Sequence, residues 1–284
     1  MSWHLVEKLG EGGGGAVWRA AHPTLGTAAV KVFSPDVGGM DEEIRTVAGM
    51  QHPGIVRVLD YGRYPDEEPA HGGRSWMAME LFPHTLRSRG PGRWDVLSDI
   101  VLGLLDVLAY AHARGVVHRD LKLSNVLVDP DRRRWALADF GLAVHERPRD
   151  GAPHGGTPVY MAPEQFDPSP HRLGPWTDLF ALAVVAWRLA YGAPPWPSRD
   201  WTEAAVQRAT PPEPGRPRFR VPAGLPRLLL RCLALRPGDR PSTAAELREA
   251  WLALGSVKAG RRARPTSQDD APTEHTDASA PTVV

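Results

Sequence analysis

Three polar residues in one short run carry the strongest chemical signal in this 284-residue sequence. Asp120, Lys122 and Asn125 alternate with apolar residues directly after a predicted helix. A carboxylate and an amide oxygen suit Mg²⁺, which keeps several water ligands and takes others from phosphates. Asn125 offers such an amide oxygen, and the alternative for the run is a polar loop closed by an ordinary Asp–Asn turn.

Asp139 joins the same site if the intervening segment forms a hairpin. Residues 126–128 and 135–138 predict two short strands joined by the turn Asp-Pro-Asp-Arg. The two ends of an antiparallel hairpin meet in space. Asn125 before the first strand and Asp139 after the second can therefore share a hard cation, with Asp120 and Lys122 beside them.

Two features near the N-terminus also point to phosphate. Residues 10–15 hold five glycines, and glycine lets a backbone approach phosphate oxygens closely. The cluster lies between two predicted strands and opens no helix, which argues against a Rossmann site; a flexible hairpin turn is the alternative. Lys31 follows one hairpin later. Its ammonium group either points at phosphates from inside a cleft or is a solvated side chain on a strand.

The elements that must position these residues form a β-rich first part and a helical second part. Alternation and turn residues predict strands, and a 3.6-residue apolar period predicts helices. The predicted elements before residue 83 are strands over 6–15, 16–20, 28–33, 55–61 and 75–81 and one helix over 41–50. The later predicted helices cover 96–114, 177–191, 225–235 and 243–254. The helix over 177–191 is apolar almost all round, which predicts burial.

Composition and charge exclude several classes of protein. The formal net charge of +1 gives no reason to expect a nucleic-acid or anionic membrane partner. Cys232 is the only cysteine, so an internal disulfide is excluded, and we expect a small buried hydrophobe there. The longest apolar run, 179–187, is far shorter than the roughly 20 residues that cross a bilayer. We therefore expect a cytoplasmic protein with no membrane span.

Together these motifs resemble the eukaryotic-type (Hanks-type) Ser/Thr protein kinases, in their soluble bacterial form. The resemblance covers about residues 5–254. Its motifs are Gly10/Gly12/Gly15/Val17, Ala29-Val30-Lys31, His118-Arg119-Asp120 with Asn125, Asp139-Phe140-Gly141 and Ala162-Pro163-Glu164. It implies an α+β, bilobal kinase-like fold with a small β-rich N-lobe (1–82) and a larger, mainly helical C-lobe (83–256). Residues 257–284 lack aromatic, Leu and Ile residues, which predicts a disordered tail.

The resemblance implies ATP and Mg²⁺ as cofactors and Ser/Thr hydroxyls of protein substrates as acceptors. Asp120 would act as the catalytic base, Lys122 would neutralise the transferring phosphoryl group, and Asn125 and Asp139 would bind Mg²⁺. The residues implied to contact ATP are Leu9, Gly10, Glu11, Gly12, Gly13, Gly15, Val17, Ala29, Lys31, Glu43, Met79, Glu80, Leu81 and Leu127.

Some of these positions have more specific roles by the same resemblance. Lys31 would pair with Glu43, or alternatively with Glu42, and Met79 would lie at the back of an adenine pocket whose hinge is 80–82. Further contacts are implied outside the ATP site: Glu164 would pair with Arg240, and Asp178 would tie the buried helix to the catalytic loop.

The chain departs from the family where kinases often carry an activating phosphate. No Ser, Thr or Tyr lies between Leu142 and Gly156. We therefore hypothesise that Arg119 pairs with Glu146 or Asp150, and the alternative is a solvated or backbone-bonded arginine. The tail holds six Ser/Thr residues that could be self-phosphorylated and bound by phosphothreonine-binding modules; a plain solubilising tail is the alternative.

Two other functions compete with an active protein kinase. A pseudokinase scaffold would bind ATP without turnover, and its sign would be loss of Lys31, Asp120 or Asp139, all of which are present. A small-molecule kinase on a related fold is disfavoured by residues 156–164, which with Arg240 resemble the segment that receives protein substrates.

Overall fold

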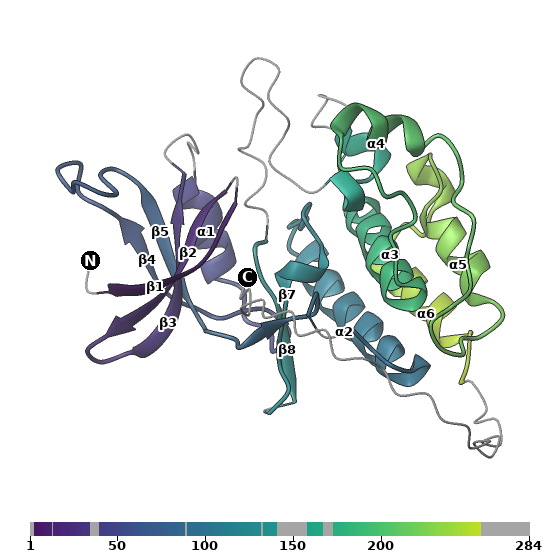
Figure 1. The fold of residues 1–284 in the computed structure, drawn as a ribbon, viewed down its shortest axis with the longest axis horizontal. Coiled ribbons are helices and arrows are strands. Elements are labelled where there is room, and N and C mark those ends of the chain that lie inside the picture. The colour runs from purple at the N-terminus through teal and green to yellow at the C-terminus, as the bar shows by residue number, and fades with distance from the viewer. Residues whose placement is uncertain are drawn as a thin grey trace, which may run out of the picture.

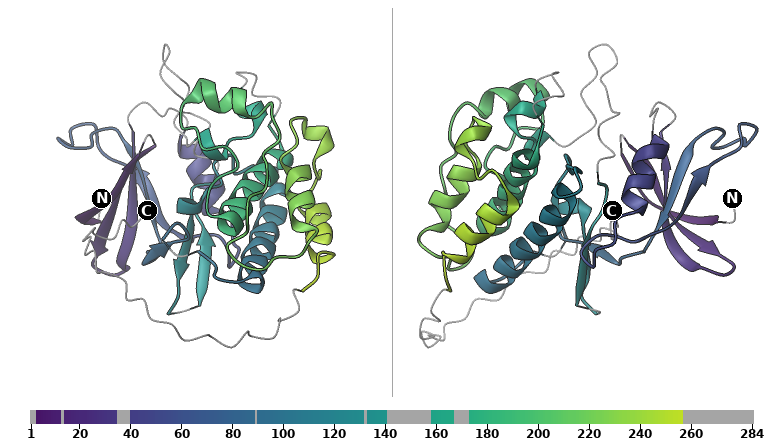
Figure 2. Two further views of the ribbon diagram at one scale, coloured as in Figure 1. Left: turned by 45° about the vertical axis from the view of Figure 1, so that its right-hand side comes forward. Right: turned by 180° about the vertical axis from the view of Figure 1, so that it is seen from behind.

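The computed structural model describes residues 3–12, 14–34, 40–88, 90–131, 133–140, 158–166 and 173–256, and it arranges them as two lobes (Figure 1). A twisted antiparallel sheet with one helix beside it forms the first lobe, and a group of helices forms the second (Figure 2). The predicted α+β, two-lobed class is therefore confirmed.

The sheet of the first lobe has the strand order β1-β2-β3-β5-β4, and each neighbouring pair is antiparallel. Its elements are β1 (His4–Gly12), β2 (Gly15–His22), β3 (Gly26–Phe33), α1 (Met40–Ala48), β4 (Val58–Arg63) and β5 (Ser75–Met79). Residues 28–33 of β3 are buried, which fits the near-continuous apolar run in its sequence. All five predicted strands and the predicted helix are present, with their ends shifted by a few residues.

A second, three-stranded antiparallel sheet lies between the lobes (Figure 1). It consists of β6 (His84–Thr85), β7 (Val126–Asp129) and β8 (Arg134–Leu137), so the predicted hairpin is confirmed. Two residues are too few to show a strand pattern, and β6 was not predicted. The strand predicted over 55–61 starts only at Val58, because Val56 N–H donates to the Leu137 carbonyl at 3.0 Å. This small sheet therefore links the first lobe to the polar run.

The helices of the second lobe are α2 (Trp94–His112), α3 (Pro175–Tyr191), α4 (Trp201–Gln207), α5 (Leu225–Cys232) and α6 (Ala244–Leu252). Four of them were predicted; α4 has only seven residues and was missed. Within the residues described, no helix combines the length and the apolar character that a bilayer crossing requires.

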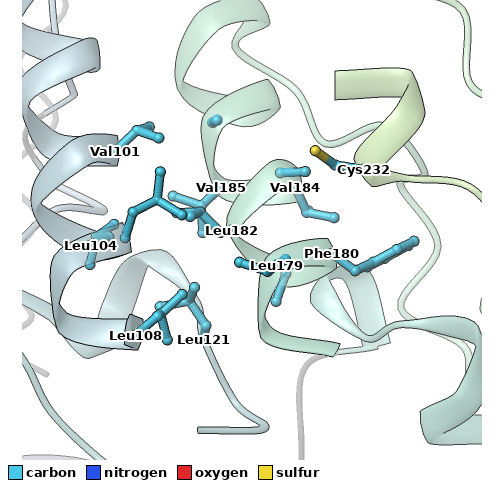
Figure 3. Close-up of a cluster of buried hydrophobic side chains, with 14 of the residues drawn as sticks. Val101, Leu104, Leu108, Leu121, Leu179, Phe180, Leu182, Val184, Val185 and Cys232 are labelled. Atoms are coloured by element: carbon cyan, nitrogen blue, oxygen red, sulfur yellow. The ribbon is translucent and has the colours of Figure 1, made fainter. Parts of the chain in front are cut away.

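The buried helix α3 forms the centre of this lobe. Leu104 and Leu108 of α2 face it from one side together with Leu121, and Cys232 of α5 lies on the other side (Figure 3). Burial raises the pKa of the Cys232 thiol to about 12, so the thiol stays protonated at neutral pH. The expectation of a small buried hydrophobe at Cys232 is therefore confirmed, and Leu121 anchors the polar run to the core.

Candidate active site

The β7–β8 hairpin brings the two expected metal ligands to one place. Val126 pairs with Leu137, and Ala138 N–H donates to the Asn125 carbonyl at 2.8 Å, so Asn125 and Asp139 leave the hairpin at the same end. Asp139 has φ 61°, in the left-handed region that residues other than glycine seldom adopt. Backbone strain of this kind gathers at functional sites.

Asp120, Lys122 and Asn125 form one hydrogen-bonded cluster. Lys122 Nζ donates to Asp120 Oδ2 at 2.7 Å, and Asn125 Nδ2 donates to the same oxygen at 3.2 Å. Asn125 Nδ2 also donates to the Asp120 carbonyl at 2.8 Å. Because its amide nitrogen is committed to Asp120, the amide oxygen of Asn125 is the atom that remains for a cation.

Lys31 reaches across from the first lobe to the same cluster. Its Nζ lies 2.8 Å from Asp139 Oδ1, and the two side chains are 11% and 19% exposed. Burial favours the neutral acid, but Lys31, Lys122 and His118 outweigh it and hold the pKa of the Asp139 carboxyl below its ordinary value. Asp139 is therefore a carboxylate at neutral pH.

The carboxylates expected to pair with Lys31 lie on α1. Glu43 and Glu42 are part of that helix, but their side chains are outside the described part of the structure. The Lys31–Glu43 pair stays a prediction, and the Lys31–Asp139 contact was not foreseen from sequence.

His118 joins the catalytic loop to the end of β8. Its buried ring accepts the Asp120 N–H at Nδ1 (3.2 Å), so the proton is assigned to Nε2, which donates to the Ala138 carbonyl at 2.9 Å. The ring also packs against Phe140, with centroids 4.6 Å apart. These contacts hold Asp120 in a fixed relation to Asp139.

The buried carboxylate of Asp178 holds the loop from α3, as expected. Its Oδ2 accepts the His118 N–H and its Oδ1 accepts the Arg119 N–H, both at 2.8 Å. His112 Nε2 lies 2.7 Å from Oδ2, a contact not predicted although this histidine ends the helix just before the run. Arg119 has φ 66°, and a left-handed residue costs about 1–2 kcal/mol, which these charge-assisted bonds offset.

A small apolar cavity opens beside Asp139. Its lining combines β2, β3, the hinge after β5 and β7, namely Val17, Ala29, Met79, Glu80, Leu81, Phe82, Leu127, Ala138 and Asp139. Six of the residues predicted to contact ATP therefore lie together with Phe82 of the predicted hinge, while Ala138 was not predicted to line the pocket. A larger hollow of about 590 Å³ shares Glu80 and Leu81 but contains no catalytic-loop residue, so the smaller cavity is the one beside the chemistry.

The hinge is tied to the small sheet by an ion pair. The Glu80 carboxylate pairs with Arg134 of β8, and the Glu80 N–H donates to the Arg57 carbonyl at 3.0 Å. The guanidinium of Arg134 also lies 5.3 Å from the centre of the Phe82 ring. The side chain of Glu80 thus fixes the hinge to the small sheet.

Farther into the second lobe, the predicted Glu164–Arg240 pair is present. Arg240 Nη1 and Nη2 donate to the two Glu164 oxygens at 2.8 and 2.9 Å, and the side chains are 0% and 4% exposed. Thr177 Oγ1 of α3 donates to Glu164 at 2.9 Å. This bidentate, buried pair joins the segment around Glu164 to the helices behind it.

Comparison with known proteins agrees with this geometry. The family model described as "Protein kinase domain" matches residues 3–252. This chain belongs to the protein kinase family. The kinase domain of Mycobacterium tuberculosis PknI has a similar solved structure, with a TM-score of 0.64 and 26% identity over 89% of this chain and 96% of that one.

Two curated bacterial kinases are similar in sequence. The DNA damage-responsive serine/threonine-protein kinase RqkA of Deinococcus radiodurans is 34% identical, and the match covers 97% of this chain and 44% of the relative. Serine/threonine-protein kinase pkn3 of Myxococcus xanthus is 33% identical, with coverage of 98% and 53%. The chain thus spans about half the length of these relatives.

Part of the kinase site stays untested. Gly13 and Gly141 lie outside the described residues, as do Glu146 and Asp150, the expected partners of Arg119. Arg119 Nε is buried, and within the described segments it has no hydrogen-bond partner. The pairing of Arg119 with a carboxylate therefore remains a hypothesis.

The glycine-rich hairpin of the kinase N-lobe holds the remaining predicted ATP contacts. Leu9, Gly10, Glu11 and Gly12 lie on β1, and Gly12 pairs with Gly15 at the start of β2. Gly15 has φ 131°, and a Cβ there would lie 2.2 Å from the Val32 carbonyl oxygen. This position requires glycine on both counts.

Gly15→Ala is expected to lower the free energy of unfolding by about 1–3 kcal/mol and to raise the KM for ATP, because the hairpin must distort. Gly92→Ala is the matched control, since Gly92 is exposed outside the predicted ATP site and nothing lies within 4 Å of a Cβ there. Denaturant unfolding and ATP titration check both variants. Equal effects of the two substitutions would contradict the expectation.

Proposed function

We propose that this chain is a Ser/Thr protein kinase that transfers the γ-phosphoryl group of ATP to hydroxyls of protein substrates. The observation that carries the proposal is the cluster of Asp120, Lys122 and Asn125 beside the Lys31–Asp139 pair, next to a small apolar cavity that six of the predicted ATP contacts line. The printed names of the relatives, which are serine/threonine-protein kinases, support the acceptor class.

In this proposal the residues act mainly by position and charge, since the transition state of phosphoryl transfer is loose. The cavity receives adenine, and the hairpin from Leu9 to Val17 covers the phosphates together with Lys31. Asp120 orients the acceptor hydroxyl and takes its proton. Lys122, 2.7 Å from Asp120, offsets the charge of the transferring group.

The residues present fit the Mg²⁺ that the family generally uses. The amide oxygen of Asn125 and the carboxylate of Asp139 are hard oxygen donors at one end of the hairpin, and phosphate oxygens complete such a set. Bound there, Mg²⁺ would supply positive charge to the phosphates of ATP.

The pseudokinase alternative is not favoured, because Lys31, Asp120 and Asp139 are all retained and lie in one site.

We keep the division into an N-lobe (1–82), a C-lobe (83–256) and a tail as a proposal. Trp94 Nε1 donates to the Gly255 carbonyl at 3.1 Å, which supports extending the C-lobe at least to Gly255. The tail lies outside the described residues, and its recognition by phosphothreonine-binding modules stays a proposal. We also propose a cytoplasmic location, because ATP is the donor.

The test is transfer of labelled γ-phosphate from ATP to the chain itself and to dephosphorylated casein, with and without excess EDTA. We expect label on Ser or Thr by mass spectrometry, abolished by EDTA and strongly reduced in the Asp120→Asn variant. ATP binding without any label would overturn the proposal in favour of a scaffold, and label confined to small molecules would overturn the acceptor class.

A further inference from the structure

One buried arginine has no carboxylate partner among the residues that the structure describes. Arg208, at the C-terminal end of α4, is 2% exposed. Its Nη2 donates to the carbonyls of Pro158 (2.7 Å) and Val159 (3.1 Å), and its Nε donates to the Met161 carbonyl at 3.1 Å. Nη1 donates to the Ala204 carbonyl at 3.4 Å. Three of its four acceptors thus belong to one short segment, 158–161.

Aromatic rings enclose the guanidinium of Arg208. Its Cζ lies 4.5 Å from the centre of the Trp196 ring, and the rings of Phe166 and Phe180 follow at 5.8 and 6.0 Å. Burial lowers the pKa of Arg208 to about 10, which leaves it charged at neutral pH. Burying a charge is costly, and here carbonyl dipoles and ring faces offset the cost. An uncharged side chain could fill the same space without this desolvation cost.

The segment that Arg208 holds is linked directly to the catalytic loop. Ala162 N–H donates to Gln165 Oε1 at 2.9 Å, and Gln165 Nε2 donates to the Arg119 carbonyl at 2.8 Å. Arg119 is the residue before Asp120. Residues 158–161 therefore lie beside the loop that carries Asp120, with Pro158, Val159 and Tyr160 buried and Met161 half-buried.

We propose that Arg208 is a positioning residue for the protein acceptor: by gathering the carbonyls of 158–161 it fixes the segment that supports the acceptor beside Asp120. The inference rests on the proposed kinase function. A planar guanidinium presents five N–H donors in a fixed fork, whereas a lysine ammonium is a point charge with three. Lysine therefore keeps the charge of Arg208 but cannot hold these carbonyls in the same arrangement.

The test compares Arg208→Lys with wild type in the full chain. Phosphorylation of dephosphorylated casein reports acceptor use, and ATP hydrolysis without casein reports the ATP site alone. We expect the ratio of casein kcat/KM to the hydrolysis rate to fall about tenfold in Arg208→Lys, because lost positioning acts on the acceptor. Arg227→Lys, an exposed arginine on α5, is the matched control and is expected to keep the wild-type ratio.

A second variant covers the case in which Arg208→Lys does not fold. Arg208→Gln removes the buried charge and keeps two N–H donors, and we expect its ratio to fall as well. A folded variant whose casein and hydrolysis rates fall in equal proportion, or do not change, would overturn the inference alone. A wild-type chain that neither hydrolyses ATP nor labels casein would overturn the proposed function and this inference with it.

Discussion

Asp120→Asn is expected to lower the kcat of phosphotransfer by about 10²–10⁴-fold, the usual contribution of a general base. An amide has the shape of the carboxylate but cannot take the proton of the acceptor hydroxyl. The amide oxygen can still accept from Lys122, whose Nζ lies 2.7 Å from Asp120 Oδ2. We therefore expect the fold and the KM for ATP to change little.

Steady-state kinetics with dephosphorylated casein and thermal unfolding check this expectation. The matched control is Asp99→Asn, the same substitution at an exposed position on α2. A kcat near wild type in Asp120→Asn would show that proton removal by this carboxylate contributes little. A large drop in melting temperature would instead trace the lost rate to misfolding.

Glu164→Gln is expected to lower the free energy of unfolding by about 3–5 kcal/mol, because it leaves a buried cation without its counter-charge. Arg240 is 0% exposed at its side chain and meets both oxygens of Glu164 at 2.8 and 2.9 Å. The remaining acceptors of Arg240 are the neutral carbonyls of Ala234 and Leu235. They cannot replace a carboxylate.

Guanidinium chloride unfolding measures this effect. Glu7→Gln is the matched control, because Glu7 pairs with Arg19 at the surface and such pairs contribute less than about 1 kcal/mol. Combining Glu164→Gln with Arg240→Met removes both charges, and the double variant is expected to be more stable than Glu164→Gln. A loss below about 1 kcal/mol in Glu164→Gln would show that the pair does not hold this lobe together.

The sequence alone determined the family, the class of fold and the order of the elements other than β6 and α4. Each motif consists of specific residue types at short spacing, so it can be recognised in the sequence without a structure. The order of the motifs along the chain then identified the family and its fold. The hairpin that joins Asn125 to Asp139 is local, and its turn residues predicted it. The apolar character of α3 predicted a central helix, and Glu164, Arg240 and Asp178 followed from the family resemblance.

Only the tertiary structure decided several further contacts across the fold. It paired Lys31 with Asp139, placed His112 against Asp178 and sequestered Arg208 among aromatic rings. It also added β6 and α4, which are too short to show a period. A local sequence pattern predicts that an arginine is exposed. Its actual burial depends on residues that are distant in the sequence. Arg208 is buried because α4 packs against residues 158–161, nearly fifty positions earlier in the chain.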